Sequence, residues 1–401
     1  MKFCIIKERK NPPDRRVVFS PNKLIAFKNK FPEAELVIES SDIRVFSDDE
    51  YKNVGLKVTK DVADCDVFLG VKEVPVDALI SNKKYFFFSH TIKKQPYNRK
   101  LLQAILRKNI DLYDHETIVK ENGARLIGFG RYAGIVGAYN GFRAIGLKNN
   151  SFNLPKAETL NSQKELIEEL RKVKLSNIKI VLTGNGKVAY GAKEMLDAMQ
   201  IKKVAVEEYL VKTFNEPVYC FIDVLDYNKR KDGLVINNKD FYNNPKEYKS
   251  DFMRFAKVSD FFIAGHYYGD DAPYLFTRED AKKEDFKIKY VADISCDING
   301  PVASTIRPST IANPIYGYHA KLEKEIDFRD SDAIVVMAVD NLPCELPKDA
   351  SEGFGEMFLE HVIPAFFNND KDGVLKRAKM TENGKLTERF SYLQDYVDGK
   401  E

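Results

Sequence analysis

The features that mark a membrane or secreted protein are missing from this sequence of 401 residues. No apolar run approaches the roughly 18–20 residues that are needed to span a bilayer. The first ten residues, MKFCIIKERK, hold four apolar residues between charged ones, which is too few for the apolar segment of a signal peptide. We therefore expect no membrane partner and no secretion.

An excess of charge of one sign is missing as well. The chain has 63 Lys and Arg against 60 Asp and Glu, a formal net charge of +3 at pH 7. Such a balance does not favour a phosphate backbone as partner. The sequence therefore predicts no nucleic-acid partner.

Cysteine is scarce, and its spacing forms no CxxC pair. This pattern predicts reduced thiols, a cytoplasmic location and no metal site for the five cysteines: Cys4, Cys65, Cys220, Cys296 and Cys344. There are 22 Gly and 16 Pro, too few for a low-complexity chain, and no repeat of fixed period is present. With 44% hydrophobic and 31% charged residues, the sequence indicates a globular enzyme of two or three domains.

The first 130 residues alternate short apolar runs with helical patterns. They predict a helix after Ser20, an N-cap followed by Pro21 in the first turn, and a second helix over about residues 98–108. Strands are expected at Phe3–Ile6, Leu36–Glu39, Val67–Leu69 and Tyr85–Phe88. Strands that alternate with helices indicate a mainly parallel sheet with helices on both faces.

A second series of alternating units runs from Ile178 to about residue 340. Its expected strands, after the one at Ile178, are Val204–Val206, Phe261–Ala264, Tyr290–Ile294 and Ile334–Val339. Before it, RYAGIVGAYNGFRAIG is interpreted as a closely packed helix or as a helix between two domains, and Ser162 with Glu165 predicts a capping box. The span 226–251 is interpreted as an elaborated loop, and a last helix is expected over about 350–366.

These patterns predict an α/β fold of two doubly wound Rossmann-like domains with an interdomain cleft. The first domain is expected to comprise residues 1–135 with about 350–401, and the second residues 136–349.

The sharpest motif is IKIVLTGNGKVAYGAKEML, in which an apolar strand leads directly into Gly184, Gly186 and Ala189. This is G-x-G-x-x-G/A in a strand–turn–helix context, where the turn and the helix N-terminus accommodate a pyrophosphate. Glu207 and Glu208 follow at about the offset of the acid that binds the ribose. The motif predicts a dinucleotide site; the alternative is a tight turn without a ligand.

Two titratable side chains follow apolar strands of the first domain. Lys72 with Glu73 lies in LGVKEVP, and His90 lies in YFFFSHTIKKQ. Ligand-binding groups gather at the ends of strands in open α/β sheets, so the pair is a candidate for acid/base catalysis. The alternatives are a surface lysine and a structural histidine. Glu116, in LYDHETI, is a third group nearby if the strands are neighbours.

Several strings carry a family resemblance that runs nearly from end to end. They are KERKNPPDRRVVFSP, VKEVP, FFFSHTIKKQPYNRKLL, RLIGFGRYAGIVGAYN, ADISCDINGP and AVDNLPCELPKDASEGFGEM. The chain resembles the lysine-forming saccharopine dehydrogenases of the alanine dehydrogenase-like superfamily. It resembles in particular the lysine–2-oxoglutarate reductase module of bifunctional aminoadipic semialdehyde synthase.

The resemblance implies roles for individual positions. Lys72 and His90 correspond to the acid/base pair of the family, and Glu73 and Glu116 to acidic neighbours that modulate it. Arg16 and Arg125 correspond to arginines that bind substrate carboxylates, and Phe129 to an aromatic residue of the substrate pocket. The cofactor side comprises Gly186, Lys187, Glu208, Tyr267, Asp297, Val339, Asp340, Asn341 and Leu342.

The implied function is a reversible, NAD- or NADP-dependent condensation of L-lysine with 2-oxoglutarate to saccharopine. The first domain would then bring the substrates and the acid/base groups, and the second the dinucleotide. The alternatives are an alanine dehydrogenase-like enzyme and a nucleotide-binding protein without turnover. Glu207 and Glu208 favour NAD, because a carboxylate repels a 2′-phosphate, whereas the resemblance to the reductase module favours NADPH.

Overall fold

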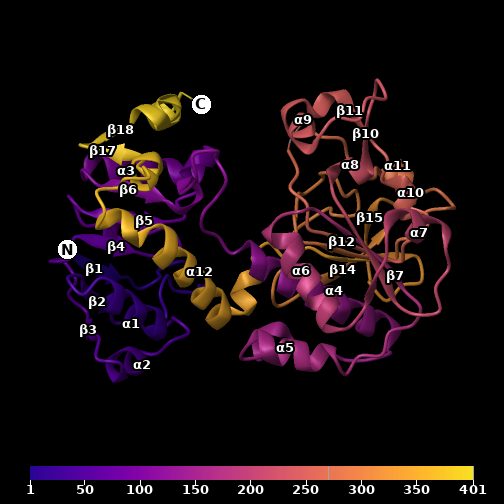
Figure 1. The fold of residues 1–401 in the computed structure, drawn as a ribbon, viewed down its shortest axis with the longest axis horizontal. Coiled ribbons are helices and arrows are strands. Elements are labelled where there is room, and N and C mark those ends of the chain that lie inside the picture. The colour runs from indigo at the N-terminus through magenta and orange to yellow at the C-terminus, as the bar shows by residue number, and fades with distance from the viewer. Residues whose placement is uncertain (270, 401) are drawn as a thin grey trace. The chain divides into compact units, whose positions relative to one another are not determined.

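The computed structural model describes residues 1–269 and 271–400. The chain divides into two compact units (Figure 1). Unit 1 comprises Met1–Phe129 and Pro347–Glu401, and unit 2 comprises Gly130–Leu346. The expected boundary at residue 135 falls within a helix, α4 (Gly130–Asn149), which belongs to unit 2.

Unit 1 is built on a six-stranded sheet in which all strands are parallel, in the order β3-β2-β1-β4-β5-β6. The strands are β1 (Lys2–Ile5), β2 (Glu35–Glu39), β3 (Lys57–Thr59), β4 (Val67–Leu69), β5 (Lys84–Phe87) and β6 (Asp111–Asp114). The chain builds β1 to β3 on one side and then returns to place β4 on the other side of β1. This reversal makes the β1/β4 border the topological switch point of the sheet.

Helices cover both faces of this sheet. On one face α3 (Arg99–Arg107) and the C-terminal α14 (Gln394–Asp398) pack on a core that includes Phe68 and Tyr85. On the other face Phe3 and Phe86 contact the Phe366 ring, with ring centroids 5.2 and 5.7 Å apart. The remaining elements of unit 1 are α1 (Pro21–Lys30), α2 (Asp48–Asn53), α12 (Pro347–His361), α13 (Val374–Ala378) and the β17–β18 hairpin (Thr381–Glu382 and Lys385–Leu386). The predicted N-cap Ser20 accepts a hydrogen bond from the Lys23 amide, as expected.

Unit 2 is built on an eight-stranded sheet in the order β15-β14-β16-β13-β12-β7-β9-β8. The six strands from β16 to β8 are parallel to one another, and β14 pairs antiparallel with both of its neighbours, β16 and β15. Their bounds are β7 (Lys179–Thr183), β8 (Lys202–Lys203), β9 (Val218–Ile222), β12 (Phe261–Ala264), β13 (Tyr290–Asp293), β14 (Ile315–His319), β15 (Lys324–Ile326) and β16 (Ala333–Met337). The sheets and their helices confirm the expected α/β, doubly wound class.

Two helices of unit 2 approach each other unusually closely. A Cβ added to Gly134 of α4 would lie 1.9 Å from the Val188 carbonyl oxygen of α6 (Lys187–Ala198). A Cβ on Gly191 would lie 2.0 Å from the Arg131 carbonyl oxygen. The small residues of RYAGIVGAYNGFRAIG therefore serve close packing within unit 2. The other helices of this unit are α5 (Gln163–Leu170), α7 (Val206–Val211), α8 (Val224–Tyr227), α9 (Asn238–Asn243), α10 (Met253–Ala256) and α11 (Arg278–Ala281).

Three local expectations for unit 2 are wrong. The strand expected at Val204–Val206 is replaced by the two-residue β8 and by α7, which starts at Val206. A run of three apolar residues is too short to separate strand from helix, and acids in the first turn favour the helix. The span expected as a loop contains α8, α9 and a hairpin of β10 (Asn228–Arg230) with β11 (Tyr248–Ser250). Ser162 caps α5, but the Glu165 carboxylate accepts from the Asn161 amide, so the capping box is not formed.

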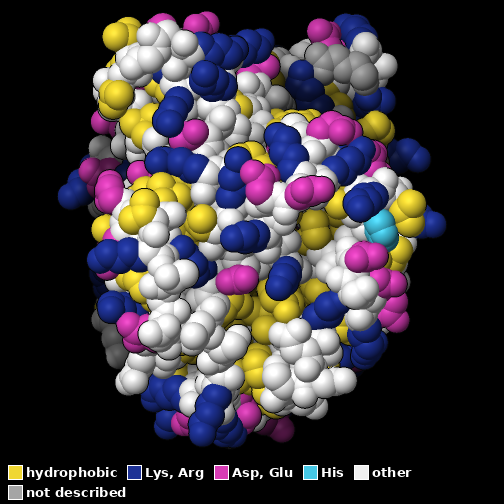
Figure 2. All heavy atoms as spheres, turned by 90° about the vertical axis from the view of Figure 1, so that its right-hand side faces the viewer, with side chains coloured by type: hydrophobic (Ala, Val, Ile, Leu, Met, Phe, Trp, Pro, Cys, Tyr) yellow, Lys and Arg dark blue, Asp and Glu magenta, His cyan; other side chains and the backbone are white. Residues whose placement is uncertain are grey.

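The surface carries both signs of charge. Figure 2 shows one face, on which Lys and Arg side chains alternate with Asp and Glu side chains. Among the described residues, no helix combines the length and the apolar character that crossing a membrane requires.

Candidate active site

Lys72 follows β4 on a loop that is held tightly in place. The Val71 and Lys72 amides donate to the two carboxylate oxygens of Glu8, over 2.6 and 2.9 Å. The Gly70 carbonyl oxygen lies 2.8 Å from Nε2 of the buried His115. A Cβ on Gly70 would lie 2.7 Å from a side-chain carbon of Ile6, so the loop passes close to the residue that follows β1.

An arginine–carboxylate pair lies beside Lys72. Arg16, only 3% exposed, donates Nε–H and Nη2–H to Asp14 over 3.0 and 2.6 Å. Burial would raise the pKa of Asp14, but the charge and hydrogen bonds of Arg16 and the charge of Lys72 hold it below its ordinary value. The Arg16 guanidinium also stacks over the Phe129 ring, 4.3 Å from its centroid. The structure thus brings Lys72, Arg16 and Phe129 together around Asp14, a residue that the sequence did not identify.

His90 and Glu73 face each other across neighbouring loops. Nδ1 of His90 lies 3.5 Å from a Glu73 oxygen, and Nζ of Lys10 donates to the same carboxylate over 3.0 Å. Burial alone would raise the pKa of Glu73; hydrogen bonds from His90, from its own backbone and from Lys10 outweigh this and lower it to about 2. Glu73 is therefore ionised at neutral pH, and its carboxylate faces the His90 ring.

Glu116 and Arg125 form an ion pair. Arg125 Nη2 donates to Glu116 Oε1 over 2.9 Å, and Lys93 Nζ lies 3.7 Å from the same oxygen. Oε2 of the buried Glu116 has no hydrogen-bond partner among the described residues.

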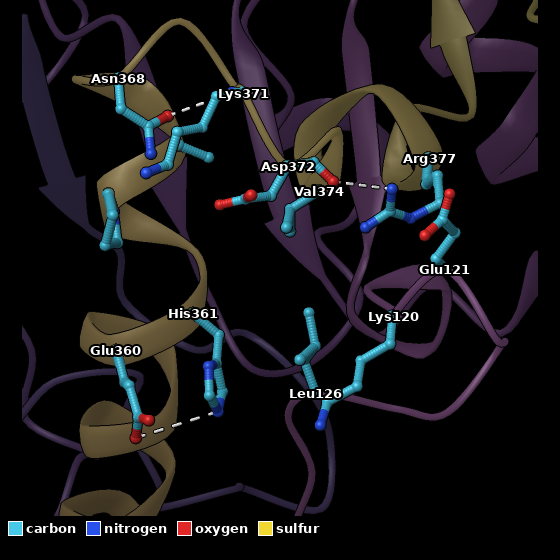
Figure 3. A pocket seen from close by; sticks show the side chains of 12 residues that line it. Lys120, Glu121, Leu126, Glu360, His361, Asn368, Lys371, Asp372, Val374 and Arg377 are labelled. Atoms are coloured by element: carbon cyan, nitrogen blue, oxygen red, sulfur yellow. Dashed lines mark hydrogen bonds and ion pairs between the residues drawn. The ribbon is translucent and has the colours of Figure 1, made fainter.

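A cavity of about 510 Å³ lies elsewhere in unit 1, at the end of α12 (Figure 3). Lys120, Lys371 and Arg377 line it together with Glu121, Asp372 and His361. The His361 ring contacts Glu360, and Arg377 donates to the Asp372 carbonyl oxygen. Neither Lys72, His90 nor Glu73 lines this cavity, so it is distinct from the candidate active site.

The glycine turn of unit 2 follows β7 and begins α6. Gly184 has a φ of +104°, and a Cβ there would lie 2.6 Å from the Gly265 carbonyl oxygen at the end of β12. Gly186 is the N-cap of α6, and a Cβ there would meet no atom within 4 Å. The first glycine is thus required by the turn, whereas the second leaves open space in front of the helix N-terminus. Ala189 is buried, and its Cα would lie 3.0 Å from a Cβ on Gly265.

An acid stands at the end of β9, the strand that pairs with β7. The carboxylate of Asp223 accepts from the side-chain amide of Asn185, in the glycine turn, over 3.1 Å and from that of Asn238 over 2.6 Å. Glu208 lies instead in α7, where it is half-buried and pairs with Lys212 over 2.8 Å. The strand that was expected to lead to Glu208 does not form, and Asp223, which follows VYCFI, was not among the residues expected from the sequence.

The other residues expected on the cofactor side follow neighbouring parallel strands. Tyr267, 78% exposed, follows β12; Asp297 follows β13; and Val339, Asp340, Asn341 and Leu342 follow β16. Buried Asp293 orders the segment that carries Asp297, because it accepts from the Ser295 and Thr305 hydroxyls over 2.6 Å each. Lys187 is the first residue of α6. Parallel neighbours end at the same edge of a sheet, so these residues and the glycine turn share the carboxyl edge of unit 2.

Residues 4–136 match the family model described as alanine dehydrogenase/PNT, N-terminal domain. The chain is 26% identical to alpha-aminoadipic semialdehyde synthase of Arabidopsis thaliana over 97% of this chain and 41% of that protein. It is 28% identical to the protein of Mus musculus named alpha-aminoadipic semialdehyde synthase, mitochondrial, over 92% of this chain and 45% of that protein. The chain therefore spans less than half the length of these curated relatives.

A shorter relative is the saccharopine dehydrogenase [NAD(+), L-lysine-forming] of Yarrowia lipolytica, 24% identical over 82% of this chain and 83% of that protein. Among solved structures, an L-alanine dehydrogenase superposes with a TM-score of 0.62 at 16% identity, covering 99% of this chain and 100% of that one. A transhydrogenase from Sinorhizobium meliloti superposes with a TM-score of 0.57 at 13% identity, over 96% and 100%. The two structures support the fold, and the compartment of this chain stays a prediction.

Proposed function

From its place among the homologues of saccharopine dehydrogenase in the alanine dehydrogenase-like superfamily, we propose that this chain is a nicotinamide-dependent saccharopine dehydrogenase of the lysine-forming type. Unit 1 would bind the substrates and supply the acid/base groups, and unit 2 would bind the dinucleotide. The reaction joins the ε-amine of lysine to the keto carbon of 2-oxoglutarate, and it is reversible.

The observation that carries this proposal is the set of charges at the switch point of unit 1. Lys72 follows β4 and Arg16 follows β1, the two strands that border the switch point, and His90 follows β5 beside them. Ligands of open α/β sheets bind outside the carboxyl ends of the strands at this border. Ordinary surface charges are solvated, whereas Arg16 and Glu116 are buried.

The reaction needs repeated proton transfers and cationic groups that bind the carboxylates of the substrates. Lys72 and His90 would take two protons in turn from the attacking nitrogen, which enters as an ammonium, and deliver two to the keto oxygen, which leaves as water, so that a protonated imine forms between the two substrates. Arg16 and Arg125 would bind substrate carboxylates through the planar fork of the guanidinium. Bound NADH or NADPH supplies the hydride that reduces the imine.

The decisive experiment follows NADH and NADPH oxidation by absorbance with two substrate pairs. We expect turnover with lysine plus 2-oxoglutarate and little with ammonium plus pyruvate. Equal or faster turnover with ammonium and pyruvate would replace the proposal by an alanine dehydrogenase-like function. No turnover with either pair would favour a nucleotide-binding protein.

The proposed cofactor is NAD rather than NADP, and the acid that selects it would be Asp223. A carboxylate at the end of the strand next to the glycine turn binds the 2′-hydroxyl of the ribose and repels a 2′-phosphate. A hydrogen bond to a charged group is worth about 1.5–3 kcal/mol, so Asp223→Ala should raise the KM for NADH about 10- to 100-fold. The KM for NADPH should change little or fall.

Glu208→Ala is the matched control, because Glu208 is the acid that the sequence alone suggests. It should leave both Michaelis constants unchanged, since Glu208 pairs with Lys212 on α7. A loss of NADH preference in Glu208→Ala but not in Asp223→Ala would return the role to Glu208.

A further inference from the structure

Two buried carboxylates of unit 1 have no part in the proton transfers described above. Glu8 is 4% exposed and Asp114 is fully buried. A buried carboxylate is costly unless hydrogen bonds compensate for the lost hydration. Its hydrogen-bond partners therefore indicate what it is there to hold.

Glu8 holds the Lys72 loop from across the switch point. It follows β1 and accepts the backbone amides of Val71 and Lys72, one on each carboxylate oxygen. The loop cannot rotate about β4 without breaking both hydrogen bonds. Burial raises the pKa of Glu8 to about 8 even though these two amides lower it, so the carboxyl lies where the loss of hydration opposes its charge.

Asp114 holds two further segments of the candidate site at once. It is the last residue of β6, which pairs with β5. One oxygen accepts from the Ser89 amide over 2.8 Å and from the Ser89 hydroxyl, and the other accepts from the Glu116 amide over 2.7 Å. Ser89 precedes His90, whose φ of 54° lies in the left-handed region that residues with a side chain rarely adopt. The hydrogen bonds that fix Ser89 therefore also restrict the orientation of the neighbouring His90 side chain.

We propose that Glu8 and Asp114 are positioning residues, which hold the Lys72 loop and the His90 and Glu116 loops in register for proton transfer. The proposal rests on the proposed function, because it assigns Lys72 and His90 to the reaction. Neither carboxylate needs to touch a substrate.

The first test is Glu8→Gln, which keeps one acceptor oxygen but turns an NH₂ group toward a backbone amide. A displacement of about 1 Å costs up to about 100-fold in rate, so kcat should fall roughly 10- to 100-fold while the KM for each substrate changes less than about threefold. In a Lys72→Met background the same substitution should cause no further loss, because the residue it positions is already gone.

Asp114→Asn should behave in the same way toward His90. Its loss of kcat should disappear in a His90→Asn background and persist in a Lys72→Met background. If Asp114→Asn does not fold, Ser89→Ala takes its place, because it removes only the hydroxyl that donates to Asp114. A loss that is fully multiplicative in every background would overturn the proposal.

Asp48→Asn is the matched control. Asp48 also accepts a backbone amide from a loop after a strand of unit 1, that of Ser41 over 3.1 Å, but this loop follows β2 and carries none of the site residues. The variant should lower the unfolding temperature and leave kcat unchanged. A loss of kcat equal to that of Glu8→Gln would mean that any loop anchor of unit 1 matters equally, which would overturn the proposal.

A second readout does not depend on the proposed reaction. Hydrogen exchange of the Val71 and Lys72 amides, followed by NMR, should accelerate in Glu8→Gln while that of the Ser89 amide does not, and the reverse should hold in Asp114→Asn. The rate and pH profile of acylation of the Lys72 amine, followed by mass spectrometry, should also change in Glu8→Gln. If the wild type turns over neither substrate pair, the proposed function fails while these measurements still decide the positioning. Unchanged exchange and unchanged Lys72 reactivity would overturn it.

Discussion

The backbone is constrained in different ways at Lys72 and at His90. Lys72 lies on a loop that Glu8 anchors, whereas His90 has a positive φ of 54°. Asparagine is among the few residues that adopt this region readily, so His90→Asn removes the imidazole with little added strain. For Lys72, methionine preserves the length of the side chain without its charge.

We expect Lys72→Met and His90→Asn each to lower kcat by about 10²–10⁴-fold, the usual contribution of a positioned acid or base. The double variant should lose less than the product of the two losses, since groups that act in one relay are not additive. Steady-state rates and NADH binding measure this, with binding expected to be unchanged. Near-normal kcat in both single variants would make Lys72 a surface lysine and His90 a structural histidine.

Glu73→Gln tests the charge beside His90. The carboxylate is ionised at neutral pH because its pKa is lowered to about 2, and it lies 3.5 Å from Nδ1 of His90. The neutral amide removes a negative charge that would stabilise a cation in the candidate site, so the pH–rate profile should move to lower pH. A profile that stays in place, or moves to higher pH, would separate Glu73 from the acid/base group.

At the residue level the sequence predicts the location of a side chain when that location depends only on the strand that the residue follows. Lys72 and His90 come directly after apolar runs, and this is enough to place them at a sheet edge. Glu8, Asp114 and Lys10 depend on which strand lies next to which, and a single sequence does not give the order of strands. Asp223 carries a readable signal, an apolar run of five residues that ends in an acid, which the sequence reasoning did not use.

Glycines in the elements of unit 2 have two distinct physical roles. Gly134 sits where a Cβ would lie 1.9 Å from a carbonyl oxygen of α6, whereas a Cβ on Gly186 would meet no atom within 4 Å. The first serves packing between helices. The second keeps space free at the N-terminus of α6, where the motif places the pyrophosphate.

Substitution by alanine should separate these two roles. Gly134→Ala should lower the free energy of unfolding by about 3 kcal/mol, because overpacking outweighs the gain of about 1 kcal/mol in helix propensity. Gly186→Ala should change it by less than about 0.5 kcal/mol and weaken NADH binding at least about 10-fold. Denaturant unfolding and a fluorescence titration with NADH measure the two effects. Equal effects on stability would contradict the distinction.

At the level of elements, apolar runs that end at a glycine predict strands well, whereas a run that leads into acidic residues does not. The expected strands Val67–Leu69 and Phe261–Ala264 agree residue for residue with β4 and β12. The run at Val204–Val206 is followed by Glu207 and Glu208, which favour the first turn of a helix, and α7 starts within it. β14 pairs antiparallel with β16 and with β15. The alternation of strands and helices does not predict this antiparallel edge of the sheet.

For the molecule as a whole, a buried carboxyl in each unit links stability to pH. Burial raises the pKa of Glu8 in unit 1 and of Glu345 in unit 2 to about 8, from an ordinary 4.5. Between these two values the folded state binds more protons than the unfolded state. The contribution of each group to stability is therefore present below about pH 4.5 and is lost as the pH rises through about 8.

Glu345→Gln should reduce this loss. The amide oxygen still accepts the Asn140 side chain, which now donates to Glu345 over 2.9 Å, and it carries no charge to desolvate. Relative to the wild type, the variant should gain stability between pH 5 and 9, on the order of 3 kcal/mol. Denaturant unfolding across this pH range measures the difference. A difference that does not depend on pH would contradict the raised pKa.

The chain leaves unit 1 at Phe129 and returns to it only at Pro347. A ribosome that adds about 5–20 residues per second therefore works for roughly 10–40 s on the segment between them before α12 emerges. During that time Phe3 and Phe86 lack the Phe366 ring that covers them in the finished fold. The nascent unit 1 thus leaves part of its apolar core uncovered for this period, whereas all of unit 2 is synthesised before α12.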